Sequence, residues 1–202
     1  MDRKYGSWVV LASAAAYAVF LRPQMKRWGT RLGESQRRLP GDDLIPKPNF
    51  QMTHAVTIDA PPEAVWPWIA QMGRERTGYY GLDLLTNQGI PSVTFLRQYI
   101  PAPEAGMDMD GGYQVMQVEP NRTFLFGGFN LLGPLGITRD LTALYLLERR
   151  PDGSARLLAR QRAFSYGVRG MLGNLIYEAV YFVVATQQLN RIKRHAENTA
   201  HL

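Results

Sequence analysis

Hydrophobic and polar residues alternate at residues 54–59, where His54, Val56 and Ile58 share one face. A period of two predicts a β-strand. The strand should end before Pro61 and Pro62, because proline has no N–H group to donate to a neighbouring strand. Apolar residues then recur at helical spacing as far as residue 73, which predicts a helix that follows the prolines. We expect Asp59 to cap that helix.

The same periodicities predict the elements of the rest of the chain. Residues 79–87 are expected to form a short helix, and residues 127–136 a glycine-rich loop without a nucleotide role. Alternation predicts strands at residues 112–119, 122–126, 141–149 and 154–164. A Pro-Asp-Gly turn joins the last two as a hairpin. Residues 170–197 carry apolar positions along one side, which predicts a long helix.

The first strand and helix resemble the start of the SRPBCC, or START-like, superfamily, in particular its polyketide cyclase/dehydrase-like branch. The resemblance is carried by TIDAP at residues 57–61, EAVWPW at 63–68, QMG at 71–73 and GYYGLDLLTN at 78–87. It extends over roughly residues 38–197. It implies an α+β helix-grip fold, in which a curved antiparallel β-sheet wraps around a long C-terminal α-helix. A pocket is then expected between the sheet and that helix.

Three parts of the chain are expected from composition. Residues 1–38 comprise an N-terminal apolar helix and a basic segment. Residues 39–50 are rich in proline, glycine and aspartate, which is typical of a linker. Residues 51–202 would form the SRPBCC-like domain.

The N-terminal part contains an uncharged run of residues 8–21, which begins with Trp8 and ends with Leu21. It is shorter than the roughly 20 residues that comfortably cross a bilayer. Three interpretations stay open: a membrane anchor, a cleaved export signal, and a soluble alanine-rich helix packed on the domain or a partner. The basic residues that follow resist translocation. They therefore favour a membrane-associated protein whose domain is cytoplasmic, with a soluble cytoplasmic protein as the alternative.

Composition and charge narrow the function classes. The hydrophobic content of 46% is ordinary for a globular core, and the absence of cysteine excludes disulfides and thiol catalysis. The net charge of +6 comes largely from residues 22–38 and 191–194. Because no basic groove with interleaved aromatic residues is evident, we expect a membrane-facing basic patch and no nucleic acid partner.

Few residues are arranged for catalysis or metal binding. The three histidines are widely separated, and a single histidine is more often structural than part of a triad. Asp108 and Asp110 lack further ligands at calcium-loop spacing, so we expect no metal and no cofactor. Glu178, within an apolar part of the last helix, must be ion-paired, protonated or at a pocket mouth. Asp83 is expected mainly to cap its short helix.

The last strand places Arg160 and Arg162 on the same face as Leu158. The small and apolar residues on its other face favour an outward orientation of the arginines. If they face inward, they would select an anionic or carbonyl-bearing ligand. Aromatic side chains complete the candidates, because a tyrosine hydroxyl can orient a ligand in an apolar gap. The candidate ligand-binding residues are Trp68, Tyr80, Asp83, Tyr113, Tyr145, Arg160, Arg162, Glu178 and Tyr181.

Three functions follow from these candidates. The leading hypothesis is binding of a hydrophobic small molecule or lipid in the cavity, with membrane contact through residues 8–21. The second is a cyclase, dehydratase or aromatase acting on an apolar or polyketide-like substrate, which would shape a reactive chain and supply one acid or base from a cluster of Glu178, Arg160 and Asp83. The third is a membrane-tethered interaction module without a ligand.

Overall fold

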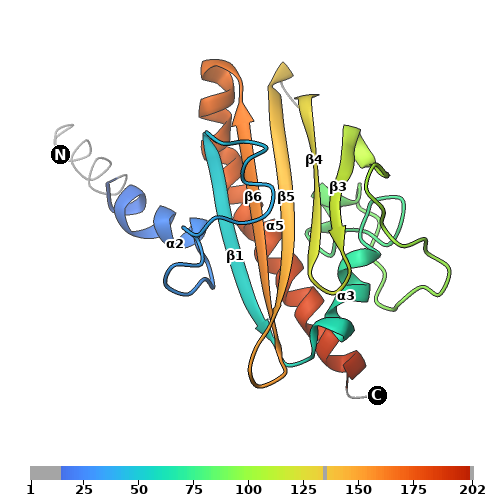
Figure 1. The fold of residues 1–202 in the computed structure, drawn as a ribbon. Helices are drawn as coiled ribbons and strands as arrows, with labels where there is room; N and C mark the ends of the chain where they lie inside the picture. The colour runs from blue at the N-terminus through green and yellow to red at the C-terminus, as the bar shows by residue number, and fades with distance from the viewer. Residues whose placement is uncertain (1–14, 134–135, 201–202) are drawn as a thin grey trace, which may run out of the picture.

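Six antiparallel strands form one sheet in the order β1-β6-β5-β4-β3-β2. The computed structural model describes residues 15–133 and 136–200. The long helix α5 (Gly167–Ala200) lies diagonally across one face of the curved sheet, which confirms the predicted helix-grip fold (Figure 1). The strands are β1 (Phe50–Ile58), β2 (Asp108–Met109), β3 (Tyr113–Glu119), β4 (Thr123–Leu132), β5 (Thr138–Arg149) and β6 (Ala155–Ser165).

Short helices connect the first strand to the rest of the sheet. They are α3 (Pro62–Ala70) and α4 (Asp83–Thr86), and the 3-10 turn η2 (Asp110–Gly112) joins β2 to β3. The prediction that Asp59 caps α3 was wrong. Pro61 holds the N-cap position, and the backbone amide of Asp59 donates instead to Glu197 of α5. The helix expected at residues 79–87 forms only as α4, because Tyr80 adopts a left-handed φ of 57°.

Two strand boundaries differ from the predictions. β1 begins at Phe50 rather than at residue 54. β4 continues to Leu132 through the glycine-rich segment that was expected to be a loop. Glycine fits there because a Cβ atom at Gly127 would lie 2.4 Å from the carbonyl oxygen of Leu141, where β4 approaches β5 closely.

The sheet has a packed core on each face. The larger core lies under α5 and includes Phe50, Met52, Tyr145, Leu157 and Leu189. A smaller core covers the opposite face, with residues Leu39, Ala55, Leu125, Leu144, Leu146 and Leu158. Burial of apolar side chains on both faces explains why the strands carry few positions that are polar and exposed.

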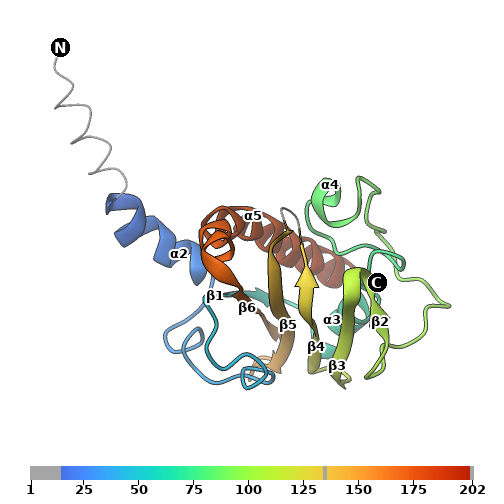
Figure 2. The same cartoon turned by 90° about the horizontal axis from the view of Figure 1, so that it is seen from above.

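The N-terminal segment wraps around the edge strand β1. The π-helix η1 (Tyr17–Leu21) runs directly into α2 (Arg22–Lys26). Figure 2 shows η1 leading away from the domain, while α2 is held to α5 through Glu178. The carbonyl oxygen of Trp28 accepts a hydrogen bond of 3.1 Å from the amide of Ala55. Gly29 permits this contact, because a Cβ atom there would lie 2.0 Å from the carbonyl oxygen of Ala55. The open edge of the sheet is thereby covered.

The following residues cover the outer face of the sheet. Leu39 and Ile45 are buried there, and Asp42 forms ion pairs with Arg160 at 2.6 Å and Arg162 at 3.1 Å. Residues 39–50 thus lie against β6. The domain boundary within them stays a prediction. Of the apolar run at residues 8–21, positions 8–14 lie outside the described residues.

Candidate functional site

A cavity of about 240 Å³ lies between the sheet and the middle of α5. Strands β3 to β6 provide one wall, α5 provides the second, and the segment around α4 closes the third side. The lining residues are Arg74, Tyr79, Leu85, Thr86, Tyr113, Phe126, Leu141, Ala143, Tyr145, Gln161, Tyr177, Tyr181, Val184 and Gln188. Its position is the one that the helix-grip order predicts for a pocket.

A small residue in the sheet helps to open this space. Ala143 of β5 pairs with Phe126 of β4 on one side and with Gln161 of β6 on the other. Ala143 has only a methyl group, whereas Tyr145, the next residue of β5 on the same face, carries a large ring. Side chains on neighbouring strands stand about 5 Å apart, so an alanine between larger residues leaves room that α5 does not fill.

Two glutamines in the cavity wall bind tyrosine hydroxyls. The hydroxyl of Tyr145 donates to Oε1 of Gln188 at 2.7 Å, and the hydroxyl of Tyr177 donates to Oε1 of Gln161 at 2.9 Å. Gln188 also donates to the carbonyl oxygen of Tyr79 at 2.6 Å. These bonds hold both amides in fixed orientations.

Two further tyrosines of the wall have hydroxyls available to a ligand. Within the described residues, no hydrogen bond is seen on the hydroxyl of Tyr113 or Tyr181, and neither is among the buried polar atoms without a partner, so both open onto the cavity. Burial raises the pKa of Tyr181 well above its ordinary value. Burial also raises the pKa of Tyr113, although Arg139 and Arg74 act in the opposite direction. Both phenols are therefore neutral at pH 7, and they can donate hydrogen bonds but are poor bases.

The wall thus combines apolar surface with neutral donors. Burial likewise raises the pKa of Tyr177 to about 12. The carboxylates among the sequence-predicted residues are absent from the lining. Chemically, such a site can enclose an apolar body and donate hydrogen bonds to a carbonyl or hydroxyl oxygen.

Of the aromatic residues proposed from the sequence, the structure brings Tyr113, Tyr145 and Tyr181 together in the cavity wall. Trp68 lies elsewhere, stacked on His195 with 4.7 Å between ring centroids. Tyr80 is also buried outside the cavity, where its hydroxyl accepts a hydrogen bond of 2.6 Å from Gln71. Both therefore support the packing of the α3 region.

The charged candidates occupy three separate places. Arg160 and Arg162 lie on the outer face of the sheet, as the alternation favoured, and are covered by the segment that carries Asp42. Glu178 faces α2, where Arg22 binds it through two hydrogen bonds of 2.7 and 2.9 Å. Asp83 accepts hydrogen bonds from Ser92 and Arg191 beside α4.

Several wider depressions lie elsewhere in the described structure, among them two beside residues 91–100. One of these two, of about 490 Å³, is lined only by the loop at residues 95–100. The other, of about 420 Å³, is polar and lies around Asp83, Arg191, Arg194 and His195. We take the cavity under α5 as the candidate site, because neither of these two is lined by both the sheet and α5.

Solved structures share this architecture. A hypothetical protein from Helicobacter pylori, jhp0584, matches with a TM-score of 0.56 at 10% identity, over 83% of this chain and 99% of that one. The architecture that the two share is the helix-grip fold, an antiparallel sheet with a long C-terminal helix. Protein MLL2253 from Mesorhizobium loti has a TM-score of 0.47 at 16% identity, over 74% of this chain and 98% of its own. The di-domain ARO/CYC StfQ of the steffimycin pathway has a TM-score of 0.46 at 13% identity, over 75% of this chain and 52% of StfQ.

The likeness to the Helicobacter pylori protein shows the fold alone. No protein-family model matches the chain, and no curated protein matches it. The assignment of a ligand or reaction therefore depends on the cavity of this chain.

Sequence reasoning missed the two glutamines of this cavity. Gln161 alternates with Ala159 and Ala163 on the inward face of β6, where it is the polar exception. Gln188 follows Tyr181 by seven residues, or about two helical turns, and so faces the same side of α5. A search for single polar residues on otherwise apolar faces would have found both.

Proposed function

We propose that this chain binds a small hydrophobic molecule that carries a hydrogen-bond acceptor, in the cavity between the sheet and α5. The observation that carries the proposal is the pair of phenol hydroxyls, on Tyr113 and Tyr181, which line the cavity and are not among the buried polar atoms that lack a partner in the described structure. Both hydroxyls are therefore open to a ligand. A hydrogen bond from one of them to a carbonyl or hydroxyl oxygen of the ligand would contribute about 0.5–1.5 kcal/mol.

The size of the cavity supports a small ligand. Its volume of about 240 Å³ is below the roughly 300–1,000 Å³ of typical ligand sites. An aromatic compound of one or two rings, or one acyl chain of a lipid, is compatible with this space. A whole phospholipid is not.

We further propose that the N-terminal helix tethers the domain to a membrane, with the domain on the cytoplasmic side. Val19, Phe20 and Leu21 of η1 are exposed, although all three are apolar. The basic residues that follow would then lie next to the lipid headgroups, where cations favour cytoplasmic retention.

The other two functions receive less support. The enzymatic alternative requires Glu178, Arg160 and Asp83 to act together, and each forms ion pairs in a different part of the fold. An interaction module without a ligand would be expected to fill its interior with side chains, and a cavity is left.

A thermal-shift screen of the full chain in mild detergent tests ligand binding. The panel contains short fatty acids and aromatic ketones. A compound at 100 times its dissociation constant stabilises the folded state by about 2.7 kcal/mol. For a chain of this size the midpoint should rise by about 5–11 °C.

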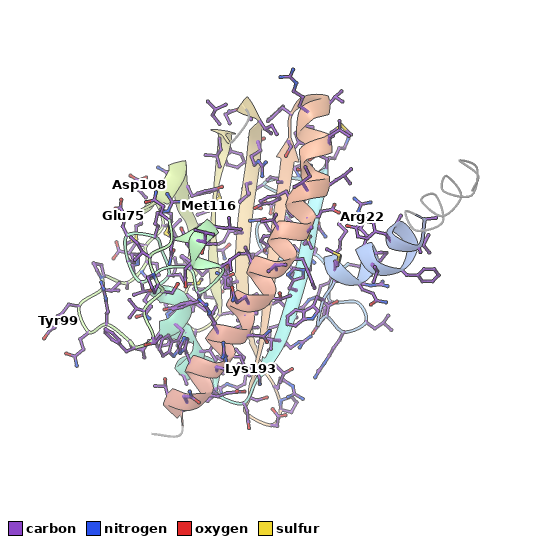
Figure 3. All side chains as sticks on the ribbon, turned by 180° about the vertical axis from the view of Figure 1, so that it is seen from behind. Arg22, Glu75, Tyr99, Asp108, Met116 and Lys193 are labelled. Atoms are coloured by element: carbon purple, nitrogen blue, oxygen red, sulfur yellow. The ribbon has the colours of Figure 1, made fainter. Side chains whose placement is uncertain are left out.

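Two variants make the screen specific. Tyr181→Phe should reduce the shift given by carbonyl compounds, because it removes one donor. Tyr99→Phe, at the exposed tip of a loop far from the cavity, should not change it (Figure 3). The proposal is overturned if no compound of either class stabilises the chain, or if both variants respond alike.

A further inference from the structure

The first two-thirds of α5 presents an apolar surface to solvent. Between residues 167 and 190 the only side chains with a formal charge at pH 7 belong to Arg169 and Glu178, and Glu178 is buried. Only 22% of the most apolar 18-residue window of α5 is buried, whereas the core helix of a soluble protein is mostly buried. The α5 outer face is defined by Val168, Met171, Leu172, Leu175, Ile176, Val180 and Val183, which are 39–74% exposed.

The α4 segment continues this apolar surface. Leu84, Leu85 and Ile90 are also exposed, and Figure 2 shows α4 on the side of α5 that faces away from the sheet. A Cβ atom on Gly81, just before α4, would lie 3.0 Å from Val184 of α5, so the two elements are in contact. Leu85 and Val184 both line the cavity. The mouth of the cavity therefore borders the apolar surface.

A third apolar element, η1, is joined to the same helix through α2. The exposed residues of η1 lead directly into α2, whose Arg22 and Lys26 both bind Glu178 of α5. Arg22 lies between the two helices in Figure 3. Glu178 belongs to the same stretch of α5 as the outer-face residue Ile176. The ion cluster thus fixes α2 against α5, and η1 extends from this attachment.

We propose that the α5 outer face and the exposed residues of α4 form a docking surface for a bilayer that contains anionic lipid. Contiguous exposed apolar patches of this kind are rare on soluble monomers and mark contact sites. The charges suit a membrane: Arg169 lies at the end of the face, basic residues follow η1, and no acidic side chain of α5 before Glu197 is exposed. Such a combination is typical of helices that lie in the membrane interface.

Docking on this surface has a consequence for the cavity. With the α5 outer face on the bilayer, the opening between α4 and α5 meets the membrane, so an apolar ligand enters from lipid without crossing water. This part rests on the proposed ligand binding, whereas the docking itself does not. A tether alone would leave the orientation of the domain free.

Site-specific labelling of the full chain tests the docking. The chain has no cysteine, so single-cysteine variants carry one environment-sensitive fluorophore each. Phe20→Cys reports the tether, Ile176→Cys and Leu84→Cys report the docking surface, and Leu44→Cys is the matched control on the outer face of the sheet. The probe is a vesicle of phosphatidylcholine and phosphatidylglycerol, with and without brominated acyl chains that quench at depth.

The proposal expects a blue shift and quenching at Ile176 and Leu84 but not at Leu44. In an Ile176→Glu background, the label at Leu84 should lose most of its quenching, while the label at Phe20 keeps it. Quenching at Phe20 without quenching at Ile176 would retain the tether and overturn the docking. A blue shift at Ile176 that depends on protein concentration and not on vesicles would also overturn it, because a second copy would then cover the face.

Discussion

Removal of the two cations that hold Glu178 should destabilise the domain more than removal of the carboxylate itself. The side chain of Glu178 is 2% exposed, whereas those of Arg22 and Lys26 are 36% and 31% exposed. If the carboxylate is lost, the two cations can turn to water. If the cations are lost, a buried carboxylate is left without a partner, which is the costly case.

The burial of Glu178 sets the order of magnitude of the losses in unfolding free energy. The double variant Arg22→Gln/Lys26→Gln should lose about 3–5 kcal/mol of unfolding free energy, as is usual when a buried ion loses its partners. Glu178→Gln should lose about 1–2 kcal/mol, the contribution of ordinary hydrogen bonds. The triple variant should be more stable than the double variant, because the unpaired carboxylate is gone.

The pH dependence gives an independent check. Burial alone would raise the pKa of Glu178, but the hydrogen bonds and charges of Arg22 and Lys26 outweigh it, so that the pKa lies below its ordinary value. The group therefore stabilises the native protein above its unfolded pKa, and this contribution is lost as pH falls through the folded pKa. In the double variant burial dominates and raises the pKa, so the sign reverses and that variant should regain stability at acidic pH.

Urea unfolding of the full chain in mild detergent, followed by tryptophan fluorescence at pH 7 and pH 5, measures both effects. The transition midpoint and its slope give the free energy of each variant. The reasoning is refuted if the double variant is more stable than Glu178→Gln at pH 7, or if the triple variant is no better than the double. Either result would mean that water reaches Glu178 once α2 is altered.

Two further predictions concern buried polar groups. Burial lowers the pKa of His54 to about 4, although its hydrogen bond to the carbonyl oxygen of Met25 acts in the opposite direction. The unfolded chain therefore binds a proton more readily, and the unfolding free energy should fall as the pH drops from about 6.5 to 4. The loss should be about 3 kcal/mol relative to a His54→Phe variant. Urea unfolding midpoints across that pH range measure the loss. The same pH dependence in the original chain and in His54→Phe would contradict the prediction. Asp42→Ala should cost about 3–5 kcal/mol because Arg160 is buried. As a control, Asp43→Ala at the exposed neighbouring position should change the unfolding free energy by less than about 0.5 kcal/mol. Equal losses for Asp42→Ala and Asp43→Ala in thermal unfolding would count against the role of the ion pair.

Local patterns were sufficient for most of the fold. The Pro-Asp-Gly turn and the alternation around it predicted the β5–β6 hairpin, and the spacing of apolar residues predicted α5. Each of these signals comes from residues that are close to one another in the chain. Tyr80 shows where such signals fail. Its helical pattern is overridden by a left-handed backbone, while its hydroxyl bonds to Gln71 and Thr77 in the packed interior.

The candidate site was harder to predict, because its residues are chosen by tertiary packing. Tyr113, Tyr145 and Tyr181 share the cavity wall, while Trp68 and Tyr80, equally aromatic, are buried under α3 and the C-terminal end of α5. Alternation favoured the correct face for the arginines of β6. Their burial under Asp42, 118 residues away from Arg160, has no local signal.

The wrapped N-terminal segment also has a mechanical consequence. Residues 22–42 are fastened to α5 through Glu178, to the edge of β1 through Ala55, and to β6 through Arg160. A pull on the N-terminal end is first taken up by the ion pairs on α5. It reaches the hydrogen bonds between β1 and β6 only after those attachments have given way. The attachments therefore give way one after another and protect the edge strand β1 from a force applied at the N-terminal end.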